Sequence, residues 1–327
     1  MSGLPQISVV IPTFNRQASL QRVVEALTCQ SLSPDKFEVI IVSDGSTDGT
    51  DEYLRAAQCD FALEVETQAN QGPAVARNRG VAMAKAPLVL YLDDDVIPSE
   101  GLLECHIKTH DRLGHGYVVI GTMSTPEHFD MSPWVSWEQR MLYKQYDAMA
   151  AGEWAATARQ FYTGNASVER LEVVAAGGFD PEFRRGEDVE LAYRLADRGL
   201  KFSFEPTAEG FHFAKRSFAS WLANASDYGR NDVIFARDHH QAWLLDKVRS
   251  EYSRRDRLTR LLTHGCHRFP VLQRIAVPVL TQSVKVSGKL HMTRVNRVGL
   301  SALYNLAYYR GLSVELGGWN QFLDMAT

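Results

Sequence analysis

Short apolar runs alternate with segments of helical periodicity over the N-terminal third of the chain. The apolar runs occupy residues 7–11, 37–42, 62–66 and 88–92, and each has the length of a strand. Helices are predicted between them, over about residues 19–29, 48–57 and 73–84, the last with Pro73 in its first turn. This alternation predicts an α/β domain with a mostly parallel central sheet and right-handed crossovers.

Carboxylates gather where two of these strands are expected to end. The run 88–92 leads directly into Asp93, Asp94 and Asp95, and Asp44 follows the run 37–42. Ionised carboxylates are costly to bury unpaired, so the strands should deliver them into the cleft at the carboxyl edge of the sheet. Hard oxygen ligands suit Mg²⁺ or Mn²⁺, and the pattern favours such an ion on a phosphate over a solvated turn.

The pattern is less regular after residue 98. We predict a helix over 104–113, strands over 116–122 and within 161–167, a helix that begins near Glu187, and a short strand over 201–206. Residues 125–160 should be less regular, either a variable loop or helices. Their aromatic side chains either pack on the domain or contact an acceptor sugar or a lipid.

A change to an all-helical pattern near residue 221 sets the domain division. We expect one domain over residues 1–218, with halves 1–98 and 99–218, and a helical accessory region over 219–327.

Composition places the chain among ordinary globular proteins, with 45% hydrophobic and 23% charged residues. Its four cysteines are scattered without a C-x-x-C pair, which argues against a zinc site or a disulfide framework. The N-terminus lacks the pattern of a signal peptide, and no apolar stretch has the length of a transmembrane helix. We therefore expect a cytoplasmic protein.

Charge is distributed unevenly, although the net charge is only −4. Residues 243–297 carry 12 basic and 3 acidic side chains, a balance of +9, which leaves −13 for the rest. The same region holds an amphipathic strip, interrupted by Pro278, of Val271, Leu272, Ile275 and Val279. One interpretation is a peripheral platform on the inner face of a membrane. The other is an accessory subdomain that packs on the first domain or forms a homodimer interface.

Several enzyme classes lack their sequence signature here. The first strand is followed by Pro12-Thr-Phe-Asn15, which is neither a dinucleotide-binding G-x-G-x-x-G nor a P-loop. A sugar nucleotidyltransferase would need a basic, glycine-rich loop at that place, and a haloacid-dehalogenase-like phosphohydrolase would need an aspartate there. These metal-dependent enzymes, and a non-catalytic nucleotide-sugar-binding protein, remain the alternatives.

Four motifs resemble, in order and spacing, those of the family 2 glycosyltransferases. They are residues 9–16 (VVIPTFNR), 42–48 (VSDGSTD), 70–80 (NQGPAVARNRG) and 92–96 (LDDDV). The resemblance covers about residues 6–215, some two thirds of the chain. It implies a GT-A fold and transfer of a sugar from a nucleotide sugar, most often a UDP-sugar, with inversion at the anomeric carbon.

The resemblance also implies a donor site. Pro12, Thr13 and Asn15 would line the nucleotide pocket, and Asp44 would bind the base or ribose. Arg77 and Asn165 would contact the donor as well. Asp93, Asp94 and Asp95 would form the D-x-D motif, in which Asp95 is the direct metal ligand and Asp93 lies nearer the ribose. His212 would complete the metal site, which holds Mn²⁺ or Mg²⁺.

The catalytic residues follow from the motif Gly186-Glu187-Asp188. The resemblance implies that Asp188 is the general base and that Glu187 orients it. Acids in a first helical turn are also the ordinary choice near the helix dipole, so this motif carries weight only with the others. Expected partners are a nucleotide sugar and a hydroxyl acceptor on a glycan, lipid carrier or other molecule, with no nucleic acid.

Overall fold

The computed structural model describes residues 4–183, 185–255, 257–290 and 292–324. The chain forms two compact units. The first contains the described residues up to Phe129 together with Leu142–Ala214, and the second contains Asp130–Met141 and the described residues from Lys215 onward. Each unit has its own hydrophobic core.

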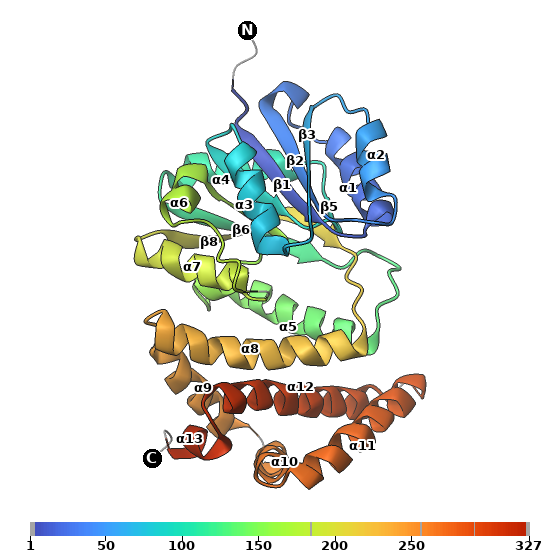
Figure 1. The fold of residues 1–327 in the computed structure, drawn as a ribbon, viewed down its shortest axis with the longest axis vertical. Coiled ribbons are helices and arrows are strands. Elements are labelled where there is room, and N and C mark those ends of the chain that lie inside the picture. Colours follow the sequence, from blue (N-terminus) through green and yellow to red (C-terminus); the bar gives the residue numbers. More distant parts are fainter. Residues whose placement is uncertain (1–3, 184, 256, 291, 325–327) are drawn as a thin grey trace. The chain divides into compact units, whose positions relative to one another are not determined.

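An eight-stranded mixed sheet forms the centre of the first unit, in the order β3-β2-β1-β4-β7-β6-β8-β5 (Figure 1). The strands β3, β2, β1 and β4 are all parallel, as the strand–helix alternation predicts. Their bounds are Ile7–Thr13 (β1), Phe37–Asp44 (β2), Ala62–Gln68 (β3) and Leu88–Leu92 (β4). The others are Val96–Pro98 (β5), Tyr117–Ser124 (β6), Asn165–Glu169 (β7) and Lys201–His212 (β8).

Helices cover both faces of the parallel strands. Ile7, Val9 and Ile11 of β1 share a core with the apolar face of α1. Val10 points to the other face, where its side chain fills the space that a Cβ on Gly80 of α3 would need. The helices of this unit are α1 (Gln17–Thr28), α2 (Thr50–Ala56), α3 (Pro73–Met83), α4 (Leu102–Leu113), α6 (Arg170–Ala175) and α7 (Glu187–Asp197).

The second half of the sheet domain is more regular than expected. Residues 125–160 contain a long helix, α5 (Pro133–Ala150), which is one of the two forms left open for this segment. The strand expected over 201–206 runs on to His212, because β8 pairs with β5 beyond the irregularity that interrupts its pairing with β6. This extension carries His212 to the strand-end acids, where it pairs in register with Val96.

The second unit is helical, as expected. Its core lies between α8 (Phe218–Asp238) and α12 (Thr293–Glu315), around Trp221, Leu300 and Leu303. Glycines let these two helices approach closely, since a Cβ on Gly229 or Gly311 would collide with the backbone of the other helix. The remaining helices are α9 (Trp243–Arg254), α10 (Arg257–Arg268), α11 (Pro270–Lys289) and α13 (Trp319–Asp324).

A search of the described residues found no helix that combines the length and the apolar character needed to cross a bilayer.

Candidate active site

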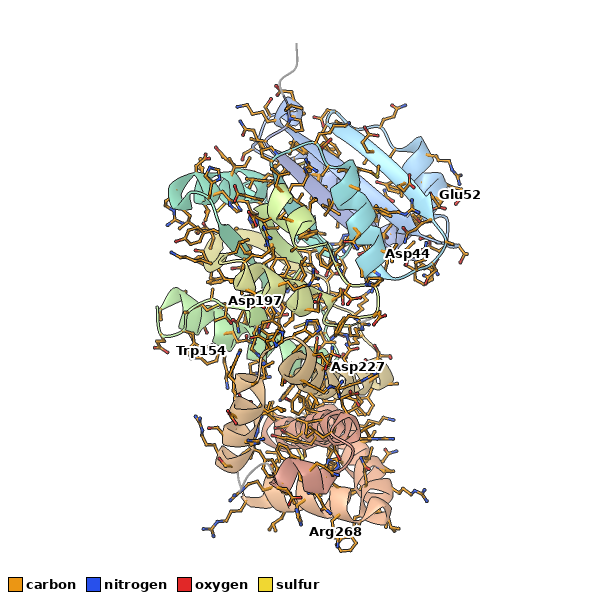
Figure 2. All side chains as sticks on the ribbon, turned by 60° about the vertical axis from the view of Figure 1, so that its left-hand side comes forward. Asp44, Glu52, Trp154, Asp197, Asp227 and Arg268 are labelled. Carbon is orange, nitrogen blue, oxygen red and sulfur yellow. The ribbon has the colours of Figure 1, made fainter. Side chains whose placement is uncertain are left out.

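Asp44 fastens the loop that leads into α3. Its carboxylate accepts hydrogen bonds from Gln68 Nε2 at 2.7 Å and from the backbone N–H groups of Gln71 and Gly72, each at 2.8 Å. The side chain is buried at the end of β2 (Figure 2). These three hydrogen bonds fix Asp44 and the start of the loop that leads into α3.

Asn15 has a similar fixing role on the neighbouring loop. Its backbone has a φ of 53°, in the left-handed region that asparagine tolerates better than most residues. Its Oδ1 accepts from the backbone N–H of Thr47 at 2.7 Å, and its own N–H donates to Ser46 Oγ. The turn after β1 is therefore tied to the loop after β2, while Pro12 stays partly exposed beside it.

Asp94, the middle acid of the three, is held by β1. Thr13 is buried and donates through Oγ1 to Asp94 Oδ2 at 2.7 Å. Burial raises the pKa of Asp94 to about 7, although the hydrogen bond from Thr13 acts in the opposite direction. Asp94 thus joins β1 to the end of β4, a structural contact that the motif alone does not reveal.

The carboxylate of Asp95, in the segment after β4, faces the imidazole of His212, the last residue of β8. The distance from His212 Nε2 to Asp95 Oδ1 is 3.4 Å, and Arg16 Nη1 lies 3.5 Å from Asp95 Oδ2. His212 Nδ1 is buried and makes no hydrogen bond within the described structure. The pair combines a carboxylate oxygen with an imidazole nitrogen, a donor set that suits a divalent cation.

Arg77 connects the strand-end acids to α7. Its Nη2 donates to Asp93 Oδ1 at 2.9 Å and its Nη1 to Glu187 Oε1 at 2.8 Å. The guanidinium is almost fully buried, so these pairs are much less screened by solvent than surface pairs. Gly164 leaves room for this arrangement, because a Cβ there would lie 3.1 Å from Asp93 Oδ2.

Glu187 and Asp188 occupy the first turn of α7, where the sequence predicted the helix to begin. Gly186 precedes them with a φ of 74°, and the acids lie at the positive end of the helix dipole. Loss of solvation raises the pKa of Asp188 to about 7. The charge of Glu187 acts in the same direction, while Arg77 opposes it. A carboxylate with such a pKa can accept a proton near neutral pH.

Asn165 belongs to a buried hydrogen-bond network. Its Nδ2 donates to the carbonyls of Thr122 and Ala208, and its Oδ1 accepts from His106 Nε2 at 2.9 Å. The network continues through Ser167 Oγ, which contacts both His106 Nδ1 and His110 Nε2 at 2.8 Å. Burial lowers the pKa of both histidines to about 4, so they are neutral here. Asn165 therefore links strands β6, β7 and β8, and both Nδ2 and Oδ1 of its amide are engaged in these hydrogen bonds.

We expect Asn165→Ala to lower the free energy of unfolding by about 2–3 kcal/mol, since it leaves two carbonyls and His106 without their buried partner. Urea unfolding of the variant and the wild type measures this change. Asn320→Ala, at an exposed position, is the control and should be nearly neutral. A loss below about 0.5 kcal/mol for Asn165→Ala would contradict the structural role.

The structure brings most of the predicted site residues to one edge of the sheet. Ion pairs join Arg77 to Asp93 and Glu187, and His212 to Asp95, which lies two residues after Asp93. Asp44 ends β2 and Asn15 lies in the turn after β1, whereas Asn165 is enclosed by strands.

Two features of the site were missed from the sequence. Arg16 lies beside Asp95, and an arginine directly after a strand-end turn was the available signal. The histidine network was also missed, although His106 and His110 have the i, i+4 spacing of one helix face.

Among the described residues, no group of three or more His, Cys, Asp and Glu side chains is placed to hold an ion. Asp95 and His212 could offer two ligands, and Mg²⁺-type ions commonly take the rest from water and substrate phosphates.

Comparison with solved structures identifies the fold. The chain is similar to the mannosyltransferase PcManGT from Pyrobaculum calidifontis, solved with GDP-Man and Mn²⁺, with a TM-score of 0.62 and 19% identity. That match covers 94% of this chain and 87% of the other. S. aureus TarS 1–349 in complex with UDP-GlcNAc matches with a TM-score of 0.59 and 18% identity, over 94% and 92% of the two chains. The fold is GT-A.

Curated relatives are glycosyltransferases. The validoxylamine A glucosyltransferase of Streptomyces hygroscopicus subsp. limoneus is 30% identical over 267 residues, 73% of this chain and 58% of that protein. Glycosyltransferase AglE of Haloferax volcanii is 28% identical over 250 residues, 76% and 77% of the two chains. The chain thus spans less than two thirds of the first of these relatives.

The family model for glycosyl transferase family 2 matches residues 8–166, which include the strand-end acids and Arg77. Sequence motifs, fold and relatives agree with this match, which places residues 8–166 in glycosyl transferase family 2.

Proposed function

We propose that this protein is a metal-dependent, inverting glycosyltransferase that moves a sugar from a nucleotide sugar to an acceptor hydroxyl. The observation that carries the proposal is the position of Arg77, which joins the D-x-D acid Asp93 to Glu187 beside Asp188. This contact brings a candidate donor-binding motif and a candidate base to one edge of the sheet. The similar proteins solved with GDP-Man and with UDP-GlcNAc support a nucleotide-sugar donor.

The donor would bind over the loops after β1, β2 and β4. Asp44 and Asn15 hold these loops in place, and Pro12 and Thr13 border the same edge. We propose a UDP-sugar as the first candidate donor. Asp93 and Arg77 would contact the donor near its ribose and diphosphate, while Asn165 would shape the pocket through the strands that it links.

Asp95 and His212 would hold a Mn²⁺ or Mg²⁺ ion together with the donor diphosphate. Their carboxylate and imidazole donors fit such an ion, and the unpaired, buried Nδ1 leaves Nε2 as the ring nitrogen that faces Asp95. The ion would supply charge stabilisation for the departing diphosphate.

Asp188 would act as the general base. Inversion requires a carboxylate that takes the proton of the acceptor hydroxyl as its oxygen attacks the anomeric carbon. Its raised pKa suits this step, because the carboxylate is both ionised near neutral pH and basic enough to accept the proton. Glu187 is held by Arg77 and fixes the first turn of α7 beside it.

A panel of nucleoside diphosphates and nucleotide sugars, each with and without Mn²⁺, tests the donor class by thermal shift. A ligand that binds the folded state raises the melting temperature, so the preferred nucleotide should give the largest rise, and only with Mn²⁺. Stabilisation by NAD or ATP alone, or by no member of the panel, would contradict the proposal.

We expect Asp95→Ala to remove the Mn²⁺-dependent part of nucleoside diphosphate affinity, a loss of at least about tenfold in Kd, because a ligand of the ion is lost. Isothermal titration calorimetry with and without Mn²⁺ measures it. Asp60→Ala removes an exposed carboxylate and is the matched control. Unchanged affinity in Asp95→Ala would exclude a ligand role.

A further inference from the structure

The second unit exposes a row of apolar side chains along α10 and α11. On α10, Leu258 and Leu261 are 72% and 70% exposed. On α11, spacings of four residues keep the exposed side chains on one face. The apolar row consists of Leu258, Leu261, Phe269, Val271, Leu272, Ile275, Val279 and Val286, all classed as exposed. Single exposed apolar residues are ordinary, but eight of them within 29 residues, on two consecutive helices and the residue between them, indicate an interaction surface.

The opposite face of α11 packs against the core of its own unit. Val284 is buried in the core around Trp221 and Leu300, and Val277 and Leu280 pack against the same cluster. The helix is therefore apolar on the side that faces its own unit and on the side that faces outward. The core of the unit covers only the inward side of such a helix. The outward side needs a second apolar environment to cover it.

Basic residues surround the row and acidic residues are absent from its sequence. Between Arg257 and Arg297 the chain has eight Lys or Arg and no Asp or Glu. Arg274 and Lys285 are exposed, and each directly precedes a member of the row on α11. Arg257 and Arg268, at the two ends of α10, are exposed as well (Figure 2 labels Arg268). Their long side chains can place the charge beyond the apolar surface that they flank.

We propose that the apolar row docks on the surface of an anionic lipid bilayer. Apolar side chains would enter the boundary between headgroups and acyl chains, and the flanking Arg and Lys would meet lipid phosphates. A second copy of the chain fits less well, because a two-fold interface would place this basic surface against itself. The proposal depends on the second unit alone and stands whether or not the proposed transferase activity is correct.

Vesicle co-sedimentation with the full chain tests the proposal. We expect binding to phosphatidylcholine vesicles that contain phosphatidylglycerol, and much weaker binding to pure phosphatidylcholine. Added salt should weaken the binding, since screening shortens the range of the charge attraction. Failure of the wild-type protein to sediment with anionic vesicles at low salt would overturn the proposal.

Matched double variants separate the two contributions. Ile275→Gln/Val279→Gln should reduce partitioning to both types of vesicle by about tenfold or more. Arg274→Gln/Lys285→Gln should reduce it by about 30-fold on anionic vesicles only, at roughly fivefold per basic residue. Leu171→Gln/Val174→Gln, which changes two exposed residues of α6, is the control and should bind as the wild type does.

Sedimentation velocity without lipid tests the competing possibility that a second copy of the chain covers the apolar row. All variants should have the oligomeric state and the circular dichroism spectrum of the wild type. A wild-type dimer that becomes monomeric in Ile275→Gln/Val279→Gln would assign the row to a second copy and overturn the proposal. Equal loss of vesicle binding in the α6 control would also overturn it.

Discussion

Asp188→Asn should lower the turnover of the nucleotide sugar by about 10²–10⁴-fold while leaving donor affinity nearly unchanged, because it removes only the proton acceptor. In the wild type, kcat should rise with pH through about 7, the pH at which Asp188 loses its proton. This rise should be absent from the residual activity of the variant. Initial rates of nucleoside diphosphate release measured across this pH range give both results.

Stability measurements show whether Asp188→Asn is simply unfolded. The pKa of Asp188 in the folded protein lies above its ordinary value near 4, so ionisation between about pH 4 and 7 lowers stability. At pH 8 the variant should therefore be at least as stable as the wild type. Asp197→Asn, at the exposed end of the same helix, is the control and should keep full activity (Figure 2). Near-normal turnover by Asp188→Asn would exclude the base assignment.

Arg77→Met should reduce the free energy of unfolding by about 3–5 kcal/mol at pH 8, because Asp93 and Glu187 lose their shared cation. Urea unfolding of the variant and the wild type measures this loss. Donor affinity should fall with it, since the guanidinium fixes Asp93.

Two further variants isolate the electrostatic cause of this effect. Glu187→Gln in the Arg77→Met background should recover part of the stability, which a double-mutant cycle measures. Arg79→Met lies on the same helix, but its partner Glu66 is exposed, so its effect should stay within about 0.5 kcal/mol. A loss that Glu187→Gln does not partly recover would assign the effect of Arg77 to packing.

The parallel strands were predictable because their local signals agree. β1, β2 and β4 are buried on both faces, so their sequences are largely apolar. The exceptions within β1 and β2 are Ser8 and Glu38, which bond each other, and polar residues follow again where the strands reach the edge of the sheet. The acids of that edge follow from the same rule. The start of α7 at Glu187 was equally clear, since Gly186 and a first turn of acids precede an apolar periodicity.

The long helix α5 was not predictable in the same way, because its residues serve two cores. Trp134 and Trp137 belong to the second unit, where they pack against the cluster around Trp221. Tyr146 belongs to the first unit and stacks on Phe204 at 5.0 Å. The apolar side chains of one helix that packs on two cores do not follow a single periodicity, so the sequence left a loop and a helix both open for this segment.

Hydrogen bonds between residues far apart in the chain could not be predicted from the sequence either. Arg77 and Glu187 are 110 residues apart, and no local pattern pairs them. The resemblance assigned Asp44 and Asn165 to donor contacts, and in the structure their hydrogen bonds hold a loop and three strands in place. The apolar strip of α11 was recognised, but only the structure shows that it faces outward.

The central claim is tested most directly by nucleoside diphosphate release from a panel of nucleotide sugars with Mn²⁺, with water as the acceptor. We predict that the wild type releases the diphosphate from one preferred sugar nucleotide and that Asp188→Asn does so at least about 100-fold more slowly. Chelation of the metal should stop release by the wild type. Equal release by the two proteins, or release that persists after chelation, would contradict this account.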